Sequence, residues 1–150
     1  MRDRSMALVI RGDKILVEEL FYHGRHFFSL PGGGVEENET PEQTAVRELK
    51  EECGLDGRVI KKLTEVYRSD GSTEYVYEVA VPEDQTAIVG YDPEEPEDAQ
   101  PIQDVCWKRL DELSEKDRAF MWSYGLMDAG GFFEELLTWG DSISYPTKEH

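Results

Sequence analysis

The sequence predicts an α+β fold, an α/β/α sandwich around a mixed central sheet, formed as a single domain over residues 1–150. Short runs rich in β-branched and aromatic residues alternate with segments that carry helix-capping signals. No internal repeat and no long linker divides the chain of 150 residues. A chain of this length buries a core without disulfides or a structural metal.

The N-terminal third predicts short strands and a glycine loop. Met6–Ile10 and Ile15–Glu18 are β-prone, and the Arg-Gly-Asp-Lys segment 11–14 between them is typical of a hairpin turn. A further strand, Phe27–Leu30, ends at Pro31. We expect Pro31–Gly34 to be a loop. Its three consecutive glycines indicate unusual backbone dihedrals or the close approach of another group.

The next segment has clear signals for a helix from Pro41 to Cys53. Thr40 is a good N-cap, Pro41 suits the first helical position, and Gln43 completes a capping box. Gly54 follows where a left-handed C-cap residue is expected. The helix therefore has well-defined ends.

The remaining elements are predicted from the same kinds of pattern. Strands are expected over Arg58–Val66, Glu74–Val81 and Val105–Lys108, and helices over Ser114–Met127 and Phe132–Trp139. Between the second and third of these strands lies an acidic, proline-containing loop, residues 91–101. In Glu74–Val81, tyrosines and valines alternate, so one face of that strand should point into the core.

Composition excludes several classes of function. The formal net charge is −17 and the densest basic cluster is only Arg58, Lys61 and Lys62, which disfavours nucleic acids and anionic membranes as partners. No apolar run approaches membrane-spanning length. Cys53 and Cys106 stand apart in apolar surroundings, which argues against zinc and for buried thiols. We expect a cytoplasmic protein.

The predicted helix has an unusual distribution of charge. Glu48, Glu51 and Glu52 are spaced i, i+3 and i+4, so they fall within an arc of about 100°. They repel one another and lie at the negative end of the helix dipole, where cations are favoured. One interpretation is a solvated acidic face, which is common. The other is a site for a divalent cation, which would reverse each of these penalties.

A longer motif favours the second interpretation. It begins at Gly33 in the glycine loop and continues with Glu39, then Arg47-Glu48-Leu49-Lys50-Glu51-Glu52-Cys53-Gly54-Leu55. This pattern resembles the Nudix box at every specified position, so the chain is identified as similar to Nudix hydrolases. A phosphate-binding P-loop does not fit, because Val35-Glu36 follows the last glycine where that motif needs Lys-Ser or Lys-Thr.

The resemblance implies the Nudix fold, with the box as a loop–helix–loop, and the hydrolysis of a nucleoside diphosphate linked to another group. It also implies a Mg²⁺ or Mn²⁺ cofactor, between which the ligands do not decide. It assigns metal binding and catalysis to Glu48, Glu51 and Glu52, and leaves open which of them is the base. In the same comparison Gly33 offers a backbone carbonyl to the metal, Arg47 holds a box carboxylate, and Glu39 braces the loop.

Residues outside the box are less well defined. Family members often add a carboxylate from a loop, and the candidates here are Glu94, Glu95, Glu97 and Asp98, of which we favour Glu97. For the substrate we consider Arg25 as a phosphate contact and Phe28 and Tyr77 as stacking surfaces for a base. Tyr75 and Trp107 are further aromatic candidates, and core packing is the alternative for each of them.

The prediction of a substrate class depends on a proline that the chain lacks. The ADP-ribose branch of the family typically carries a proline shortly after the box, yet none occurs between Asp56 and Val81. A nucleoside triphosphate hydrolase of the MutT type, releasing a monophosphate and pyrophosphate, is therefore the first hypothesis. The alternatives are ADP-ribose or a nucleotide sugar as substrate, or a non-catalytic nucleotide-sensing module. Nudix proteins are often homodimers, and the apolar segment Gly131–Trp139 is a candidate contact.

Overall fold

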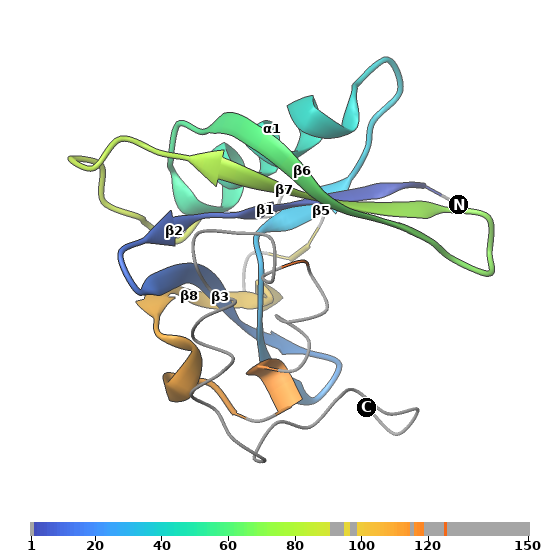
Figure 1. Cartoon of the computed structure of the whole chain (residues 1–150). Helices are drawn as coiled ribbons and strands as arrows, with labels where there is room; N and C mark the ends of the chain where they lie inside the picture. Colours follow the sequence, from blue (N-terminus) through green and yellow to red (C-terminus); the bar gives the residue numbers. More distant parts are fainter. Residues whose placement is uncertain (1, 91–94, 97–98, 115, 119–124, 126–150) are drawn as a thin grey trace, which may run out of the picture.

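The computed structural model describes residues 2–90, 95–96, 99–114, 116–118 and 125. It confirms the predicted α+β class, with many strands and the 13-residue helix α1 (Figure 1). The elements are β1 (Arg4–Leu8), β2 (Ile10–Arg11), β3 (Lys14–Tyr22), β4 (Arg25–Ser29), β5 (Gly32–Gly34), α1 (Pro41–Cys53), β6 (Arg58–Tyr67), β7 (Thr73–Ala80), β8 (Ile102–Lys108) and the 3₁₀ turn Leu110–Glu112.

The strands form two four-stranded sheets, and the first of them is the mixed sheet that was predicted. The first has the order β5-β1-β7-β6, in which β1 and β7 are parallel and the other pairs antiparallel. In the second, β3 pairs with β2, β4 and β8, always antiparallel. The sheets meet at Val9, between β1 and β2, whose carbonyl accepts a hydrogen bond of 3.0 Å from the amide of Leu16.

The predicted first hairpin is confirmed. Ile10 pairs with Ile15 and Arg11 with Lys14, and Gly12 has a positive φ of 65° in the turn between them. The strand after this turn is longer than predicted, since β3 continues to Tyr22. β3 is hydrogen-bonded to β4 on one edge and to β8 on the other. Because both neighbours pair with it, the strand continues through Glu18 and Glu19.

The prediction of a loop at Pro31–Gly34 is wrong for its glycines, which form the short strand β5. Gly32 pairs with Met6 and Gly34 with Arg4, antiparallel to β1. None of these glycines has a positive φ. Glycine is needed here because the two strands approach closely. A Cβ on Gly32 would lie 2.5 Å from the carbonyl oxygen of Ser5.

The helix α1 has the predicted bounds and caps. The hydroxyl of Thr40 accepts the amide of Gln43 at 3.1 Å, and the side chain of Gln43 accepts the amide of Thr40 at 2.9 Å. At the other end Gly54 adopts a left-handed conformation with φ 71° and donates its amide to Lys50. The orientation of every side chain on the helix follows from these ends.

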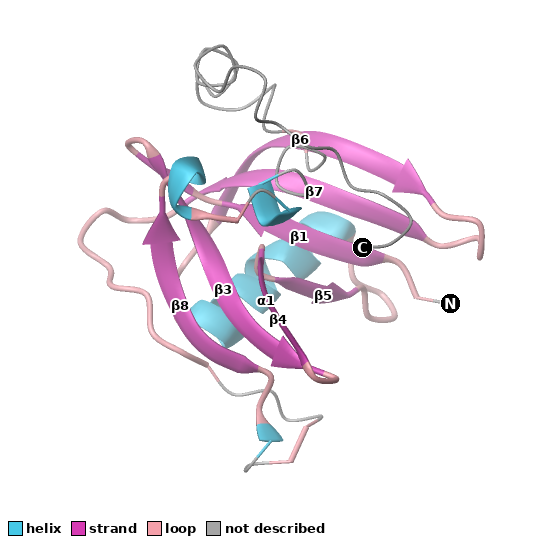
Figure 2. Ribbon diagram, turned by 90° about the horizontal axis from the view of Figure 1, so that it is seen from below, coloured by secondary structure: helices cyan, strands magenta, loops and turns pink. Residues whose placement is uncertain are grey.

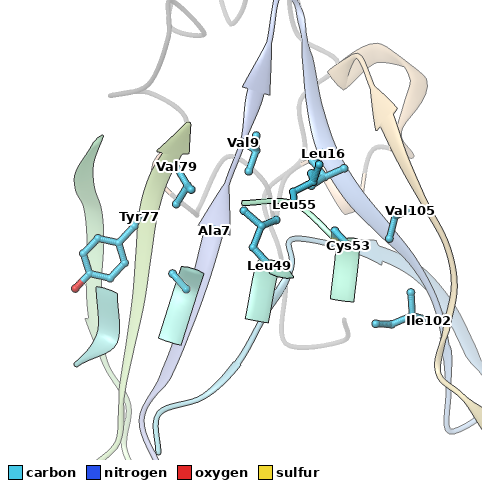
Figure 3. Close-up of a cluster of buried hydrophobic side chains, with 11 residues drawn as sticks. Ala7, Val9, Leu16, Leu49, Cys53, Leu55, Tyr77, Val79, Ile102 and Val105 are labelled. Carbon is cyan, nitrogen blue, oxygen red and sulfur yellow. The ribbon is translucent and has the colours of Figure 1, made fainter. Parts of the chain in front are cut away.

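Two hydrophobic clusters lie on opposite faces of the strands. One contains Met6, Leu8, Ile15, Val17, Leu30, Val76, Leu110 and Leu113. The other packs the apolar face of α1 against both sheets and is drawn in Figure 3; it contains Ala7, Val9, Leu16, Ala45, Leu49, Cys53, Leu55, Tyr77, Val79, Ile102 and Val105. Figure 2 shows α1 crossing the region where the two sheets meet, which fixes the helix against β1 and β5.

Some predictions fall outside the described residues. Ser114 begins a helical turn as predicted, because its hydroxyl accepts the amide of Asp117 at 3.1 Å. The rest of the expected helix to Met127, the segment Phe132–Trp139, the proposed dimer contact and most of the loop 91–101 lie outside. No helix within the described ranges is both long enough and apolar enough to cross a membrane.

Candidate active site

An open cleft of about 570 Å³ lies beside the C-terminal half of α1, within the range of about 300–1,000 Å³ typical of ligand pockets. It is lined mainly by charged side chains: the carboxylates Glu18, Glu36, Glu48, Glu51, Glu52 and Glu95 and the guanidinium groups Arg2, Arg4 and Arg47. Leu20, Phe27 and Ile102 supply apolar surface. A second, shallower depression of about 730 Å³ beside Glu42 and Val59 contains none of the three box glutamates.

Arg47 connects the carboxylates on one side of the helix. Its Nε donates to Glu39 Oε2 at 2.7 Å and its Nη2 to Glu39 Oε1 at 3.1 Å, a two-pronged contact. Its Nη1 donates to Glu48 Oε1 at 2.9 Å and to Glu51 Oε2 at 3.2 Å, and its Nη2 also reaches the carbonyl of Gly34 at 3.1 Å. The predicted role of Arg47 in holding box carboxylates therefore matches its contacts.

Glu39 is fixed from several directions. Besides Arg47, the buried hydroxyl of Thr44 donates to its Oε1 at 2.6 Å and the amide of Glu36 donates at 3.1 Å. The hydrogen bonds from Arg47 are the main reason that the pKa of Glu39 is lowered to about 2. Glu39 thus joins the loop before α1 to the helix itself.

The glycines of β5 make room for the box glutamates. A Cβ on Gly33 would lie 2.4 Å from Glu48 Oε1, so any side chain larger than hydrogen would displace that carboxylate. The amide of Gly32 donates to Glu52 Oε1 at 2.9 Å. This contact joins β5 to the last turn of α1.

Glu52 also contacts a residue that the sequence did not single out. Glu18, in the middle of β3, is only 3% exposed, and its carboxyl group lies next to that of Glu52. Burial raises the pKa of both carboxyl groups, and in Glu52 the neighbouring charge of Glu18 adds to the effect. One sequence signal points to Glu18. This residue lies between Leu16 and Leu20 at alternate positions, so it interrupts an apolar strand face.

The acidic end of the helix is capped by a later segment of chain. The amides of Ile88 and Gly90 donate to the carbonyls of Cys53 and Glu52 at 2.9 and 2.8 Å. A Cβ on Gly90 would lie only 1.8 Å from the carbonyl oxygen of Glu51, so the two segments are in close contact. These bonds satisfy terminal carbonyls that would otherwise add negative potential near the box carboxylates.

Two arginines on the rim of the cleft were also missed. Arg4 is the first residue of β1 and Arg2 lies two residues before it; a Cβ on Gly34 would lie 2.5 Å from Nη2 of Arg2. In the described part of the chain we find no hydrogen bond or ion pair for the Arg4 side chain. Its charge lowers the pKa of Glu48, which burial raises overall. Both arginines precede the first apolar run, a position that carries no sequence motif.

The three residues predicted to contact substrate are not among those that line this cleft. Tyr77 is 5% exposed in the core beside α1 and stacks on Tyr75, with ring centroids 6.3 Å apart (Figure 3). Phe28 packs against the opposite core, and Arg25 is exposed at the start of β4. Adjacent residues on a strand point to opposite faces, so Phe27 lines the cleft in place of Phe28.

The predicted loop carboxylate is only partly described. Glu94, the favoured Glu97 and Asp98 lie outside the described residues, while Glu95 lines the cleft. Its carbonyl accepts a hydrogen bond of 3.1 Å from the side chain of Gln100. Glu95 is therefore the one candidate of the four that the structure places at the site.

The donor atoms suit a hard divalent cation. No three Asp, Glu, His or Cys side chains in the described ranges are already gathered around one metal position. Glu48 and Glu52 nevertheless line one cleft with only oxygen donors, and Gly33 keeps the space beside Glu48 open. Glu52 is half-buried and lies next to another carboxyl group rather than a cation. Oxygen ligands and a deficit of positive charge fit Mg²⁺ or Mn²⁺.

Comparison with known proteins agrees with this geometry. Over 64 residues the chain is 34% identical to an ADP-ribose pyrophosphatase from Bacillus subtilis (strain 168). The aligned segment covers 43% of this chain and 35% of that protein. Over 34 residues it is 56% identical to an 8-oxo-dGTP diphosphatase from Proteus vulgaris, 23% of this chain and 30% of that protein. The matched segment thus spans about a third of each of these two relatives.

Structural comparison extends the likeness to nearly the whole chain. A NUDIX hydrolase from Nitrosomonas europaea superposes with a TM-score of 0.68 at 17% identity, covering 96% of this chain and 76% of the other, which shows a shared fold. The family model for the NUDIX domain matches residues 1–129, a range that contains the cleft, the arginine network and the whole loop–helix–loop. On this evidence the chain belongs to the NUDIX family.

Proposed function

We propose that this protein is a divalent-metal-dependent pyrophosphohydrolase that cleaves a phosphoanhydride bond in a nucleoside diphosphate linked to another group. The leading substrate class is the nucleoside triphosphates, hydrolysed to a monophosphate and pyrophosphate as in MutT-type enzymes. The single observation that carries the proposal is the convergence of Glu48, Glu51 and Glu52 on one cleft with two rim arginines. Carboxylates suit the metal and arginines suit the phosphates.

The residues divide the work between metal, phosphate and base. Glu48, Glu51, Glu52 and the carbonyl of Gly33 would hold Mg²⁺ or Mn²⁺, with Arg47 and Glu39 keeping the helix side of the site in place. When bound, the ion neutralises phosphate charge and lowers the pKa of a coordinated water. Arg2 and Arg4 are placed to bind phosphate oxygens, and Leu20, Phe27 and Ile102 offer an apolar wall to the nucleoside.

The reaction balances without any further reactant. Water adds to one of the two phosphorus atoms that share a bridging oxygen, and the bond between that phosphorus and the bridging oxygen breaks. A carboxylate of the box accepts the proton that the water loses. For a nucleoside triphosphate cleaved between its first two phosphates, the products are the monophosphate and pyrophosphate.

A second substrate class has its own support. The Bacillus subtilis relative is named an ADP-ribose pyrophosphatase, and its alignment with this chain is longer than that of the Proteus vulgaris relative. ADP-ribose and nucleotide sugars contain the same diphosphate, so the metal and phosphate contacts would serve them equally. A nucleotide-sensing module without activity is disfavoured, because all three box glutamates and Arg47 are present.

The proposal is tested by a panel of nucleotides with Mg²⁺ or Mn²⁺. The nucleotide products are separated by chromatography and quantified, with pyrophosphate release as a second readout for triphosphates (8-oxo-dGTP included), and the panel also contains ADP-ribose, nucleotide sugars and dinucleoside polyphosphates. We expect metal-dependent turnover that Glu52→Gln removes and Glu42→Gln leaves unchanged, because Glu42 is exposed in the first turn of α1. Absence of turnover across the panel with either metal would refute the enzymatic function.

A further inference from the structure

Glu18 occupies a position on β3 where an apolar residue would be expected. Leu16 and Leu20, two residues on either side, share its strand face and pack with the core beside α1. Ile15 and Val17 belong to the opposite face and the other core. Glu18 is nevertheless 3% exposed and lines the cleft that holds the box glutamates. Glu18 therefore interrupts an otherwise apolar row of side chains on this strand face, and its carboxylate is directed into the cleft.

The contacts of Glu18 do not compensate its charge. The thiol of Cys53 lies 3.8 Å from its Oε2, a weak hydrogen bond, and its other partner is the carboxyl group of Glu52. Within the described ranges, no lysine, arginine or histidine forms an ion pair with it. A buried carboxylate without a cation is unfavourable, and pairing it with a second carboxylate adds repulsion.

Neighbouring acids on the helix are treated differently. Glu48 and Glu51 each accept a hydrogen bond from Arg47, so both lie beside a cation of the protein. Glu18 and Glu52 have no such partner and face the same cleft from β3 and α1. A divalent cation between them would supply the missing charge through two oxygen ligands.

We propose that Glu18 is an additional ligand of the divalent metal, supplied by β3 from outside the box. The proposal rests on the metal site of the proposed function but not on any particular substrate. It also gives this chain a ligand on a rigid, doubly paired strand, in addition to any carboxylate from the loop around Glu95.

The test is equilibrium binding of Mn²⁺ without nucleotide, measured from the electron paramagnetic resonance signal of the free ion. We expect Glu18→Gln to weaken binding by about tenfold or more, as loss of a ligand should at least equal loss of an outer-shell partner. The matched control is Glu19→Gln, since Glu19 is adjacent on β3 and bonds His26 at 2.7 Å instead. Equal Mn²⁺ affinity in wild type and Glu18→Gln would overturn the proposal.

Thermal unfolding supplies a readout that a purely structural role would not produce. Glu18→Gln removes a buried charge, so the metal-free melting temperature should rise while the increase on adding Mn²⁺ shrinks. If Glu18 only positioned Glu52 by a hydrogen bond, glutamine would preserve that bond and the metal-induced increase. Should Glu18→Gln not fold, Glu18→Leu is measured instead, because leucine matches Leu16 and Leu20 in the same row.

Failure of this proposal and failure of the proposed function are distinguishable. Wild-type protein that binds Mn²⁺ through Glu18 but hydrolyses nothing would refute only the enzymatic function. Active protein in which Glu18→Gln binds Mn²⁺ normally would refute only the role of Glu18. Wild-type protein that does not bind Mn²⁺ would overturn the role of Glu18 directly, and the turnover panel would still decide the function.

Discussion

The carboxylates at the end of α1 are held in two different ways. One set, here called the arginine-held group, consists of Glu39, Glu48 and Glu51, all hydrogen-bonded by Arg47. The other, the buried pair, consists of Glu18 and Glu52, which contact each other and have no cation beside them in the described part of the chain. The first group is stabilised by the protein itself, whereas the second becomes favourable when an external cation is present.

The difference teaches how one short helix can be both stable and ready to bind metal. Arg47 and the amides of Ile88 and Gly90 offset negative charge at the helix end, which stabilises α1 through contacts within the protein. The buried pair has no cation of the described protein beside it, so a divalent metal can bind there in place of protons. Variants that remove one group and spare the other can separate these roles.

Removal of Glu52 is expected to have the largest effect on activity. Glu52→Gln takes a carboxylate from the buried pair, and we expect kcat to fall by roughly 10²–10⁴, the range for loss of a general base or charge-stabilising group. The fold should persist, because Gly32 can still donate to the glutamine oxygen. Steady-state kinetics and circular dichroism check this. Activity within about twofold of wild type would contradict it.

A side chain at Gly33 should disturb the arginine-held group. In Gly33→Ala the new methyl group would collide with Glu48 Oε1, and the flexible carboxylate would turn away rather than the backbone. Metal affinity should fall about 10–100-fold, like other losses of ligand orientation. The melting temperature should change little, since Gly33 has no positive φ that alanine would strain. Mn²⁺ titration and calorimetry test both, and unchanged affinity would argue against the close approach.

Arg47→Lys tests whether the forked shape of arginine matters. Lysine keeps the charge but cannot bond Glu39 with two nitrogens and also reach Glu48 and Glu51. We expect the free energy of unfolding to fall by about 1–3 kcal/mol. Urea unfolding measures the loss, with Lys50→Arg as a control, because Lys50 is exposed on the same helix. A variant as stable as wild type would show that charge alone suffices.

Arg4 should affect substrate binding rather than the fold. Arg4→Gln removes a rim cation with no bonded partner in the described ranges, so KM for a triphosphate should rise several-fold, as for loss of one charge-assisted hydrogen bond of about 1–2 kcal/mol. Arg11→Gln is the control, since Arg11 lies over Trp107 and bonds the carbonyl of Pro82. Equal KM values for the two variants would remove Arg4 from the phosphate site.

The smallest effect concerns pH and Glu39. The folded-state pKa of Glu39 is about 2, below its ordinary value of 4.5, so its contribution to stability is complete above about pH 5. That contribution is lost as the pH falls from 4.5 towards 2. The difference in unfolding free energy between wild type and Glu39→Gln should therefore shrink on acidification. Urea unfolding from pH 3 to 7 measures it, and a difference independent of pH would contradict the prediction.

Features encoded by neighbouring residues were predicted correctly. The caps of α1 depend on contacts three or four residues apart, so Thr40, Gln43 and Gly54 were sufficient to place both ends. The spacing of the box glutamates likewise determined that they share one face. The sequence predicted a loop at Gly33. It did not reveal the pairing of β5 with β1, because that pairing joins residues far apart in the chain.

What the sequence by itself determined is the family, the helix and the residues of the box, since each is encoded within a short continuous segment. Tertiary structure alone decided that Glu18 faces Glu52, that Arg2 and Arg4 reach the cleft, and that Tyr77 is in the core. The physical reason is that strand pairing sets which face of a strand is buried, and a shift of one residue exchanges the two faces.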